Sequence, residues 1–328
     1  MKKEKNILII GGAGYIGSHV VLEFCNQGEN VYVFDDLSLG KKINIDKRAE
    51  LIKGSILNKS DLDKVFLKVK PRTVIHLAAL KAAGDSMNKP QIYSETNIVG
   101  SLNILSAMLK YNIKDIIFSS SAAVYGEPQY LPMDEKHDTN PINYYGFTKK
   151  SIEDYIIWYS KLKGINYAIL RYFNAAGFDS NKRIKGLENN PQNLLPIIME
   201  VLIGKRKKMN VFGNDYNTKD GTCERDYIHV TDLANAHYLS YKKLIKDNEN
   251  IILNLATGHK YSVLDIILGC KKYLNTDLNY EFVDRREGDP EVLYAKSSYA
   301  NNLLGWKPKY SNLKYLLETT YNIYKDYK

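Results

Sequence analysis

The stretch NILIIGGAGYIGSHVV, residues 6–21, decides the fold of this chain. Its first five residues are mostly apolar, as in a short buried strand, and they run directly into a glycine-rich turn. Gly11, Gly14 and Gly17 let the backbone turn tightly, approach a pyrophosphate and pack the next helix on the strand. A helix-compatible run over residues 18–27 follows, and a helix N-terminus offers unpaired N–H groups to an anion. The stretch therefore predicts the strand, turn and helix that begin a dinucleotide-binding fold.

The next apolar run, residues 31–34, ends at Asp35, which lies 18 positions after Gly17. An acidic residue at this distance accepts hydrogen bonds from the adenosine ribose. The same charge repels a 2′-phosphate, so we expect NAD rather than NADP as the cofactor. Further along, the stretch LAALK, residues 77–81, has small side chains that would let a flat cofactor lie against the backbone. The alternative is that its alanines pack a helix.

Short apolar runs alternate with helical stretches through the first half of the chain. This rhythm is typical of a parallel sheet covered by helices on both faces, a doubly wound α/β fold of the Rossmann type. After Asn174 the rhythm breaks, and we expect a smaller, mixed C-terminal lobe. The apolar runs are residues 6–10, 31–34, 74–77, 116–119 and 168–172. The expected division is residues 1–174 for the NAD-binding domain, with a returning segment near 226–245, and 175–328 for the substrate-binding lobe.

Composition limits where the protein works and what it binds. The 328 residues are 44% hydrophobic and 25% charged, which is ordinary for a globular protein. No apolar run approaches the roughly 20 residues of a membrane span, and no signal peptide or nucleic-acid motif is present. The three cysteines are widely separated, which predicts neither disulfides nor a metal site. We therefore expect a cytoplasmic protein without a metal, a membrane or a nucleic-acid partner; the basic cluster at residues 205–208 fits a solvated loop.

Tyr145 and Lys149 form the predicted catalytic pair. They lie four positions apart at the start of a helical run, so they share one helix face about 6 Å apart along the axis. A lysine cation and a nicotinamide cation both favour the phenolate, which makes the tyrosine a usable base. Ser121 follows a predicted strand and is placed to bond the reacting alcohol. We expect Ser119 and Ser120 to cap that strand and satisfy backbone groups.

Further motifs recur along the chain, and together they resemble the extended short-chain dehydrogenase/reductase family, and within it the UDP-glucose 4-epimerases. The likeness extends over essentially the entire chain. The motifs are GGAGYIGSH (residues 11–19), LKA (80–82), SSSAAVYG (119–126), the Tyr145/Lys149 pair, RYFN (171–174), NL (193–194), RDYIHV (225–230) and RREGD (285–289).

The resemblance implies reversible epimerisation at C4 of a UDP-hexose through a transient 4-keto sugar, with bound NAD and a homodimeric protein. It implies catalysis by Tyr145, Lys149 and Ser121. It implies NAD contacts at Gly11, Gly14, Tyr15, Ile16, Gly17, Asp35, Asp36, Leu37, Ser55, Ile56, Leu77, Ala78, Ala79, Lys81, Asn97, Tyr145, Lys149 and Phe173. It implies UDP-sugar contacts at Ser121, Tyr145, Asn174, Asn193, Leu194, Phe212, Arg225, Arg286, Asp289 and Leu293.

The residues of the second lobe agree with that implication. Two separated arginines, Arg225 and Arg286, suit a diphosphate because guanidinium groups pair with phosphate oxygens. Phe212 is placed to stack on a uracil. The alternative for Arg225 is a surface ion pair with its neighbour Asp226. A similar alternative holds for Arg286, which lies between Arg285 and Glu287 in the sequence.

The chain departs from the family pattern at two places. Ser55 stands where the family usually has an aspartate that meets the adenine amine. Leu293 stands where members restricted to UDP-glucose and UDP-galactose commonly have a tyrosine. A smaller side chain there leaves room at C2 of the sugar, which predicts that N-acetylated sugars are also accepted.

Other functions remain as alternatives. The first is a UDP-GlcNAc/UDP-GalNAc 4-epimerase or a bifunctional enzyme, and the next is an enzyme acting on UDP-pentoses or UDP-uronates. A 4,6-dehydratase is disfavoured because Ala122 and Ala123 occupy the place of its acid/base pair. A non-enzymatic NAD sensor has no need of the predicted catalytic residues. Residues 98–109 and 152–162 are more apolar than one buried helix face requires, which predicts a homodimer interface; a deeply buried helix is the alternative.

Overall fold

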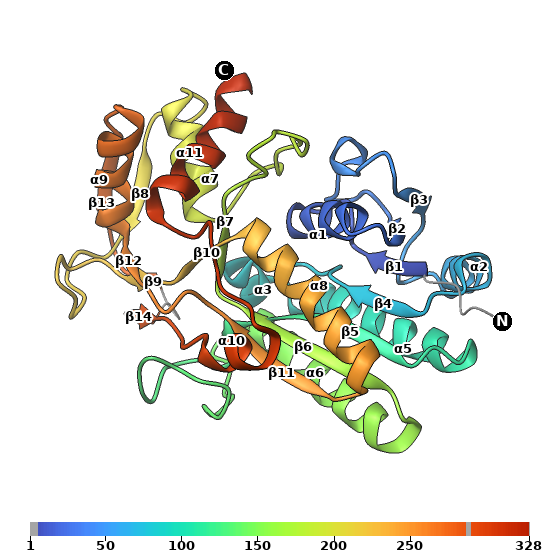
Figure 1. The fold of residues 1–328 in the computed structure, drawn as a ribbon. Coiled ribbons are helices and arrows are strands. Elements are labelled where there is room, and N and C mark those ends of the chain that lie inside the picture. The colour runs from blue at the N-terminus through green and yellow to red at the C-terminus, as the bar shows by residue number, and fades with distance from the viewer. Residues whose placement is uncertain (1–5, 287–289, 328) are drawn as a thin grey trace.

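The computed structural model describes residues 6–286 and 290–327. A seven-stranded parallel sheet forms its centre, with the strand order β11-β6-β5-β4-β1-β2-β3 (Figure 1). This arrangement confirms the doubly wound fold. The sequence pattern predicted five of these strands and missed the two at the edges, β3 and β11. The bounds are β1 (Asn6–Ile10), β2 (Asn30–Asp35), β3 (Glu50–Lys53), β4 (Thr73–His76), β5 (Asp115–Ser121), β6 (Asn166–Tyr172) and β11 (Ile251–Leu255).

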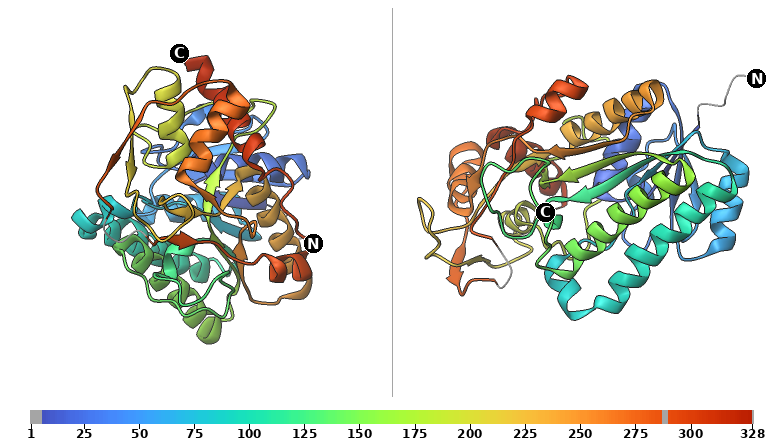
Figure 2. Two further views of the ribbon diagram at one scale, coloured as in Figure 1. Left: turned by 90° about the vertical axis from the view of Figure 1, so that its left-hand side faces the viewer. Right: turned by 90° about the horizontal axis from the view of Figure 1, so that it is seen from below.

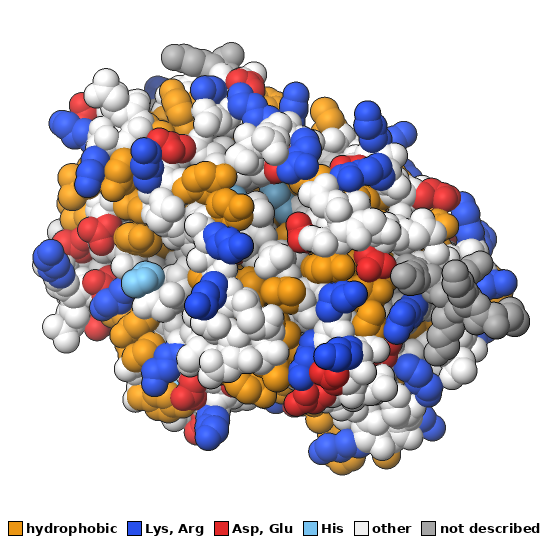
Figure 3. Space-filling model, viewed as in Figure 1, with side chains coloured by type: hydrophobic (Ala, Val, Ile, Leu, Met, Phe, Trp, Pro, Cys, Tyr) orange, Lys and Arg blue, Asp and Glu red, His pale blue; other side chains and the backbone are white. Residues whose placement is uncertain are grey.

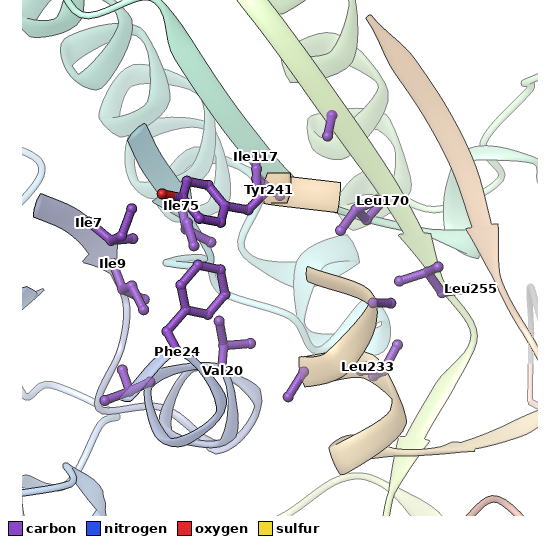
Figure 4. Close-up of a cluster of buried hydrophobic side chains, with 14 of the residues drawn as sticks. Ile7, Ile9, Val20, Phe24, Ile75, Ile117, Leu170, Leu233, Tyr241 and Leu255 are labelled. Atoms are coloured by element: carbon purple, nitrogen blue, oxygen red, sulfur yellow. The ribbon is translucent and has the colours of Figure 1, made fainter. Parts of the chain in front are cut away.

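Helices cover both faces of this sheet (Figure 2). Successive strand residues point to opposite faces, so Ile7 and Ile9 join one core while Leu8 and Ile10 join the other. The first core also holds Phe24, Leu233 and Tyr241, which Figure 4 shows between the sheet and two helices. The first face carries α1 (Tyr15–Asn26), α8 (Val230–Asp247) and α10 (Ser298–Leu304), and the second carries α2 (Lys59–Val69), α5 (Gly100–Lys110) and α6 (Tyr144–Lys163).

A second lobe has its own apolar core between three helices. In Figure 1 it lies beyond the carboxyl ends of the central strands. Its helices are α7 (Leu194–Leu202), α9 (Val263–Leu274) and α11 (Leu313–Tyr324). Its strands are β8 (Met209–Phe212) with β13 (Tyr280–Val283), and β9 (Glu224–Arg225) between β12 (Tyr261–Ser262) and β14 (Val292–Leu293). The short pair β7 (Asn174–Ala176) and β10 (Tyr227–His229) links the two lobes.

Part of the chain after residue 174 returns to the central sheet. The helix α8 packs on α1, and β11 pairs with β6 in parallel. The returning segment expected near residues 226–245 covers most of α8 but not β11. The division into two domains otherwise stays a prediction.

The surface carries its basic side chains in a dispersed pattern. On the face shown in Figure 3, lysines and arginines lie over both lobes among acidic and apolar side chains. In the basic cluster, Lys205 and Arg206 pair with Glu200, and Lys208 pairs with Glu281. Among the helices of residues 6–286 and 290–327, none is long and apolar enough to cross a membrane.

Candidate active site

The glycine-rich turn between β1 and α1 is packed tightly at two of its three key positions. Gly11 has φ +85°, and a Cβ there would lie 2.5 Å from the backbone nitrogen of Ala78. A Cβ on Gly17 would lie 2.1 Å from the carbonyl oxygen of Gly11. The protein itself therefore requires glycine at both positions, the first for the turn and the second for helix packing.

Gly14 is different, because the protein leaves space beside it. Its φ of −72° suits any residue, and an added Cβ would meet only the Gly11 carbonyl oxygen, at 3.4 Å. It stands at the N-terminus of α1, which has no side-chain cap and no acidic residue in its first turn. Open space next to unpaired N–H groups is what a pyrophosphate needs. The residues present therefore fit NAD.

Asp35 ends β2 beside this turn. Its carboxylate accepts hydrogen bonds from the backbone N–H groups of Ala13 and Leu37, each at 2.9 Å. Burial raises the pKa of Asp35, while these two hydrogen bonds lower it. Leu37 has φ +63°, an uncommon conformation for leucine, which turns the chain so that its N–H faces the carboxylate. Asp36 instead bonds Ser38 at the surface.

Ser55 and Ile56 follow β3 at the expected adenine end. The Ser55 N–H donates to the Asp61 carboxylate at 3.3 Å, and the Ile56 carbonyl accepts from the Asn103 side chain at 3.1 Å. The carboxylate of Asp61, six positions further along the chain, therefore lies near Ser55, which stands where the family usually has an aspartate. Contact between Ser55 and adenine stays a prediction.

Residues 77–81 form an irregular segment between β4 and the short helix α3 (Ala83–Asn88). These residues form no helix of their own, and contact of the alanines with the cofactor stays a prediction beside the alternative that they pack against a helix. The N–H groups of Leu77 and Ala78 both donate to the Ile10 carbonyl, which places the segment beside the glycine-rich turn.

Asn97 holds this segment in place rather than facing open space. It is fully buried in a π-helical turn, Ser94–Val99. Its amide donates to the Leu80 carbonyl and to the Thr148 hydroxyl, each at 3.0 Å, and its oxygen accepts from the Leu80 N–H at 2.8 Å. Asn97 therefore joins residues 77–81 to Thr148, the residue before Lys149.

The loop before α7 reaches back across the N-terminal half at three points. Lys81 forms an ion pair with Glu188, and the Tyr15 hydroxyl donates to the Gly177 carbonyl. Asn44 exchanges two hydrogen bonds with the backbone of Gly186. Tyr15 and Lys81 are predicted NAD contacts. In the structure both side chains also contact the loop before α7.

Tyr145 and Lys149 lie on the first two turns of α6. The Lys149 ammonium is 5.9 Å from the centre of the Tyr145 ring and donates to the Ser119 carbonyl at 2.7 Å. The start of the helix is fixed by α3, because the Tyr145 N–H donates to the Ser86 hydroxyl at 2.9 Å. The structure therefore brings together the predicted pair at the carboxyl end of β5.

Desolvation by burial acts on both groups of the pair. It raises the pKa of Tyr145 to about 12, against a hydrogen bond with Ser121 that lowers it. It lowers the pKa of Lys149 to about 7, against the charge of Glu153, which raises it. A positive charge brought next to the phenol would shift the tyrosine back toward the phenolate. A nicotinamide cation bound next to Tyr145 would therefore favour its phenolate form.

The prediction for Ser119 and Ser120 was wrong in one respect. The Ser120 hydroxyl donates to the buried carboxylate of Glu153 at 2.5 Å, not to a backbone group. Glu153 was not singled out from the sequence. Its position one helical turn after Lys149 was the available signal.

Arg225 lies in the second lobe, where β9 and β14 place it opposite Leu293 in parallel register. Both Arg225 and Asp226 are buried, so the alternative of a surface ion pair is wrong. The Asp226 carboxylate accepts hydrogen bonds from Thr257 and Gly258, which holds the loop after β11.

The other predicted sugar-nucleotide residues lie on neighbouring elements of this lobe. The Arg286 guanidinium lies 4.2 Å above the ring of Phe212 at the end of β8. Asn193 and Leu194 begin α7, whose N-terminus has no side-chain cap. The Asn174 side chain donates to the Asp226 carbonyl at 3.2 Å. Phe173 and Leu293 pack in one apolar cluster behind the ends of β5 and β6; Asp289 lies outside the described residues.

A model of the NAD dependent epimerase/dehydratase family matches residues 7–256, which is more than half of the chain. The chain belongs to this family.

Relatives of the whole chain agree with this membership. The chain is 43% identical to the UDP-glucose 4-epimerase of Halalkalibacterium halodurans over 322 residues, which span 98% of this chain and 96% of that protein. The crystal structure of UDP-glucose 4-epimerase from Brucella ovis in complex with NAD is similar with a TM-score of 0.95, at 36% identity. The enzyme from Bifidobacterium longum in complex with NAD+ and UDP gives a TM-score of 0.93, at 34% identity. In both cases 98% of each chain is covered.

The sequence analysis did not identify residues that hold the predicted site residues in place. Asp61, Ser86 and Glu188 each contact a predicted site residue through a hydrogen bond or an ion pair. Glu188 lies 107 positions from Lys81 in the chain. Contacts at such a distance have no local pattern that a single sequence could reveal.

Proposed function

We propose that this protein interconverts UDP-glucose and UDP-galactose by reversible epimerisation at C4, with NAD bound throughout. The observation that carries the proposal is the placement of Tyr145, Lys149 and Ser121 at the carboxyl end of the central sheet, two strands from β1 and its glycine-rich turn. The relative from Halalkalibacterium halodurans is a UDP-glucose 4-epimerase by name. Its similarity extends over nearly the full length of both chains, which supports the proposal.

The chain's own residues handle the proton in this reaction. Tyr145, as phenolate, accepts the proton of the 4-hydroxyl, and Ser121 bonds the same oxygen. Lys149 stabilises the phenolate with its charge, because it lies on the same helix face, and holds the cofactor ribose. NAD, when bound, would supply the reversible hydride acceptor that this reaction at C4 requires. The 4-keto sugar must present its other face before it is reduced, so the protein must hold UDP firmly and the sugar loosely.

Two groups of residues would hold the ligands. The turn at Gly11, Gly14 and Gly17 takes the pyrophosphate of NAD, and Asp35 takes the adenosine ribose. In the second lobe, Arg225 takes the UDP diphosphate. The remaining cofactor contacts proposed are Tyr15, Ile16, Asp36, Leu37, Ser55, Ile56, Leu77, Ala78, Ala79, Lys81, Asn97 and Phe173. The remaining UDP-sugar contacts proposed are Asn174, Asn193, Leu194, Phe212, Arg286, Asp289 and Leu293.

Epimerisation of UDP-GlcNAc is a second candidate activity, and Leu293 favours it. This side chain is half-buried against the apolar cluster behind the ends of β5 and β6. It is smaller than tyrosine, so it leaves more room near C2 of the sugar. We expect wild-type protein to turn over UDP-GlcNAc, and Leu293→Tyr to lose that activity at least tenfold while keeping UDP-glucose turnover. Equal UDP-GlcNAc rates for both proteins would show that position 293 does not select the sugar.

A homodimer in the cytoplasm completes the proposal. The helices α5 and α6 lie side by side on the outside of the sheet (Figure 2). Trp158 and Leu162 on α6 are 57% and 68% exposed, more than large apolar side chains on a covered face would be. The described cysteines are free thiols, which suits a reducing compartment.

Proton NMR of the purified protein with UDP-galactose and no added NAD tests the proposed activity. We expect UDP-glucose to appear and the mixture to approach equilibrium, which would also show that NAD travels with the protein. An unchanged spectrum, even after NAD is supplied, would rule out this substrate and bring UDP-GlcNAc, UDP-pentoses and UDP-uronates forward.

A further inference from the structure

The catalytic pair lies against the end of β5, next to Ser119 and Ser121. Ser121 lowers the pKa of Tyr145, and Lys149 donates to the Ser119 carbonyl at 2.7 Å. The two helix residues are four positions apart, and the two serines flank one further residue of the strand. A third contact, between that middle residue and the next turn of α6, continues the series.

Glu153 makes this third contact and has no part in the mechanism above. Its carboxylate accepts from the Ser120 hydroxyl at 2.5 Å. It also accepts two hydrogen bonds from Arg171, from Nε at 3.0 Å and from Nη2 at 2.7 Å. The side chains of Glu153 and Arg171 are only 1% and 6% exposed. A bidentate pair held this far from water has a single well-defined geometry.

Arg171 extends the contact to the next strands of the sheet. It pairs with Ser120 in the β5–β6 register. Its Nη1 donates to the Tyr125 hydroxyl at 2.9 Å, which in turn donates to the Asn254 side chain at 2.6 Å on β11. Glu153 therefore joins α6 to three neighbouring strands at the level of Ser120, one residue before Ser121.

We propose that Glu153 is a positioning residue for the reaction. Through Ser120 and Arg171 it fixes the register of α6 against β5, so that Tyr145 and Lys149 stay opposite their own partners on the strand. Because a displacement of about 1 Å in reacting groups can cost a hundredfold in rate, a fixed register matters for turnover. This inference rests on the proposed function for its kinetic test.

The charge of Glu153 acts in the same direction as its geometry. It favours the charged form of Lys149, whose pKa burial lowers. The other groups facing Lys149 are Tyr145 on its own helix, His76 at the end of β4, and Arg171 on β6 behind the carboxylate. Burial keeps His76 neutral at neutral pH, since its pKa is lowered to about 3. Loss of Glu153 would therefore shift the titration of Lys149 to lower pH.

Two variants separate positioning from simple support of the fold. Glu153→Gln keeps the shape but leaves the buried Arg171 cation without its counterion, which destabilises the protein. The double variant Glu153→Met/Arg171→Met removes both charges, and such apolar replacements of a buried pair are often neutral for stability. Glu200→Gln is the matched control, because Glu200 is a buried carboxylate paired with two cations in the second lobe.

We expect the double variant to stay folded, with kcat lowered between tenfold and a hundredfold and KM for the UDP-sugar changed less than twofold. The alkaline limb of its kcat–pH profile should move to lower pH, because that limb follows Lys149. Glu200→Gln should change stability but neither kcat nor the limb. An NMR titration of side-chain-labelled lysine, with Lys149→Met to assign the signal, gives the same shift without turnover.

The outcomes separate this inference from the proposed function. Wild-type protein that fails to epimerise UDP-galactose contradicts the proposed function, and the NMR titration then decides the role of Glu153. A folded double variant with wild-type kcat and an unmoved Lys149 titration overturns the inference and leaves Glu153 a structural residue only.

Discussion

Tyr144 and Tyr145 are neighbours at the start of α6, yet their hydroxyl groups have different partners. The Tyr144 hydroxyl bonds Ser94 at 2.6 Å, whereas Tyr145 lies beside Lys149 and has its pKa lowered by Ser121. We expect Tyr145→Phe to lower kcat by about 10² to 10⁴-fold, the usual range for loss of an acid/base group. Retained NAD, measured by its release on denaturation, should be unchanged. Tyr144→Phe is the control, and a loss of equal size there would contradict the assignment of the base.

Gly14 gives a second prediction at the scale of one residue. The protein has room for a methyl group there, so Gly14→Ala should change the free energy of unfolding by only about 1 kcal/mol. The methyl group would stand where the pyrophosphate approaches, so bound NAD should fall at least tenfold, measured by absorbance after denaturation. Full NAD content in a folded Gly14→Ala protein would show that the pyrophosphate lies elsewhere.

Single residues were predicted from the sequence where the reason for them is local. Gly11 and Gly17 are required by their own turn, and Lys149 follows Tyr145 by one turn of one helix. Glu188 was not predicted, because its partner Lys81 is brought to it only by the folded chain. The orientation of Asn97, turned inward to Leu80, was missed for the same reason.

At the scale of elements, α6 has two working faces. One face carries the catalytic pair and Glu153, while the opposite one exposes Tyr155, Trp158 and Leu162 to 38%, 57% and 68%. The deeply buried helix that the sequence left open is therefore excluded for residues 152–162 in the single chain.

We expect Leu162→Glu combined with Trp158→Glu to convert a dimer into a monomer, because two charges would be buried at the proposed interface. Sedimentation velocity at micromolar concentration measures this change. Leu268→Glu is the control, since Leu268 is a comparably exposed leucine on α9, at 64%. A monomeric wild-type protein would contradict the proposed interface.

Strands were predictable where they are apolar and continuous. β1, with all five residues buried, gives a clear signal, whereas β3 reads Glu-Leu-Ile-Lys and lies at an edge with partly exposed side chains. β11 is apolar, but it follows 78 residues after β6 that mostly belong to the other lobe, so the alternation that identified the first strands had ended. Whether a late strand such as β11 joins the central sheet depends on which elements pack together. The local sequence pattern of the strand does not show this.

At the scale of the whole molecule, four buried histidines make stability depend on pH. Burial lowers the pKa of His19 and His237 to about 4, and that of His76 and His229 to about 3. In the unfolded chain a histidine titrates near pH 6.5. Below that pH the unfolded chain therefore binds more protons than the folded protein, and stability is lost as the pH falls from about 6.5 toward 4.

We expect the four histidines to lower the free energy of unfolding in urea by about 5 to 6 kcal/mol at pH 5.5 relative to pH 7.5, with about 1.4 kcal/mol from each. Asp226 opposes this loss slightly, because burial raises its pKa to about 6 and its protonation favours the folded state. His237→Gln should reduce the slope of the free energy of unfolding against pH by the equivalent of about one bound proton below pH 6.5. Stability that stays flat over this range would contradict four neutral histidines.

The two lobes are built from segments that alternate along the chain. After β6 the chain leaves the central sheet, returns for α8 and β11, leaves again for α9, and comes back at α10. Any single cut of the chain between β6 and α10 would therefore separate residues of both apolar cores from the rest of their core. In evolutionary terms, one exchange of a continuous gene segment would therefore not replace either lobe as a unit.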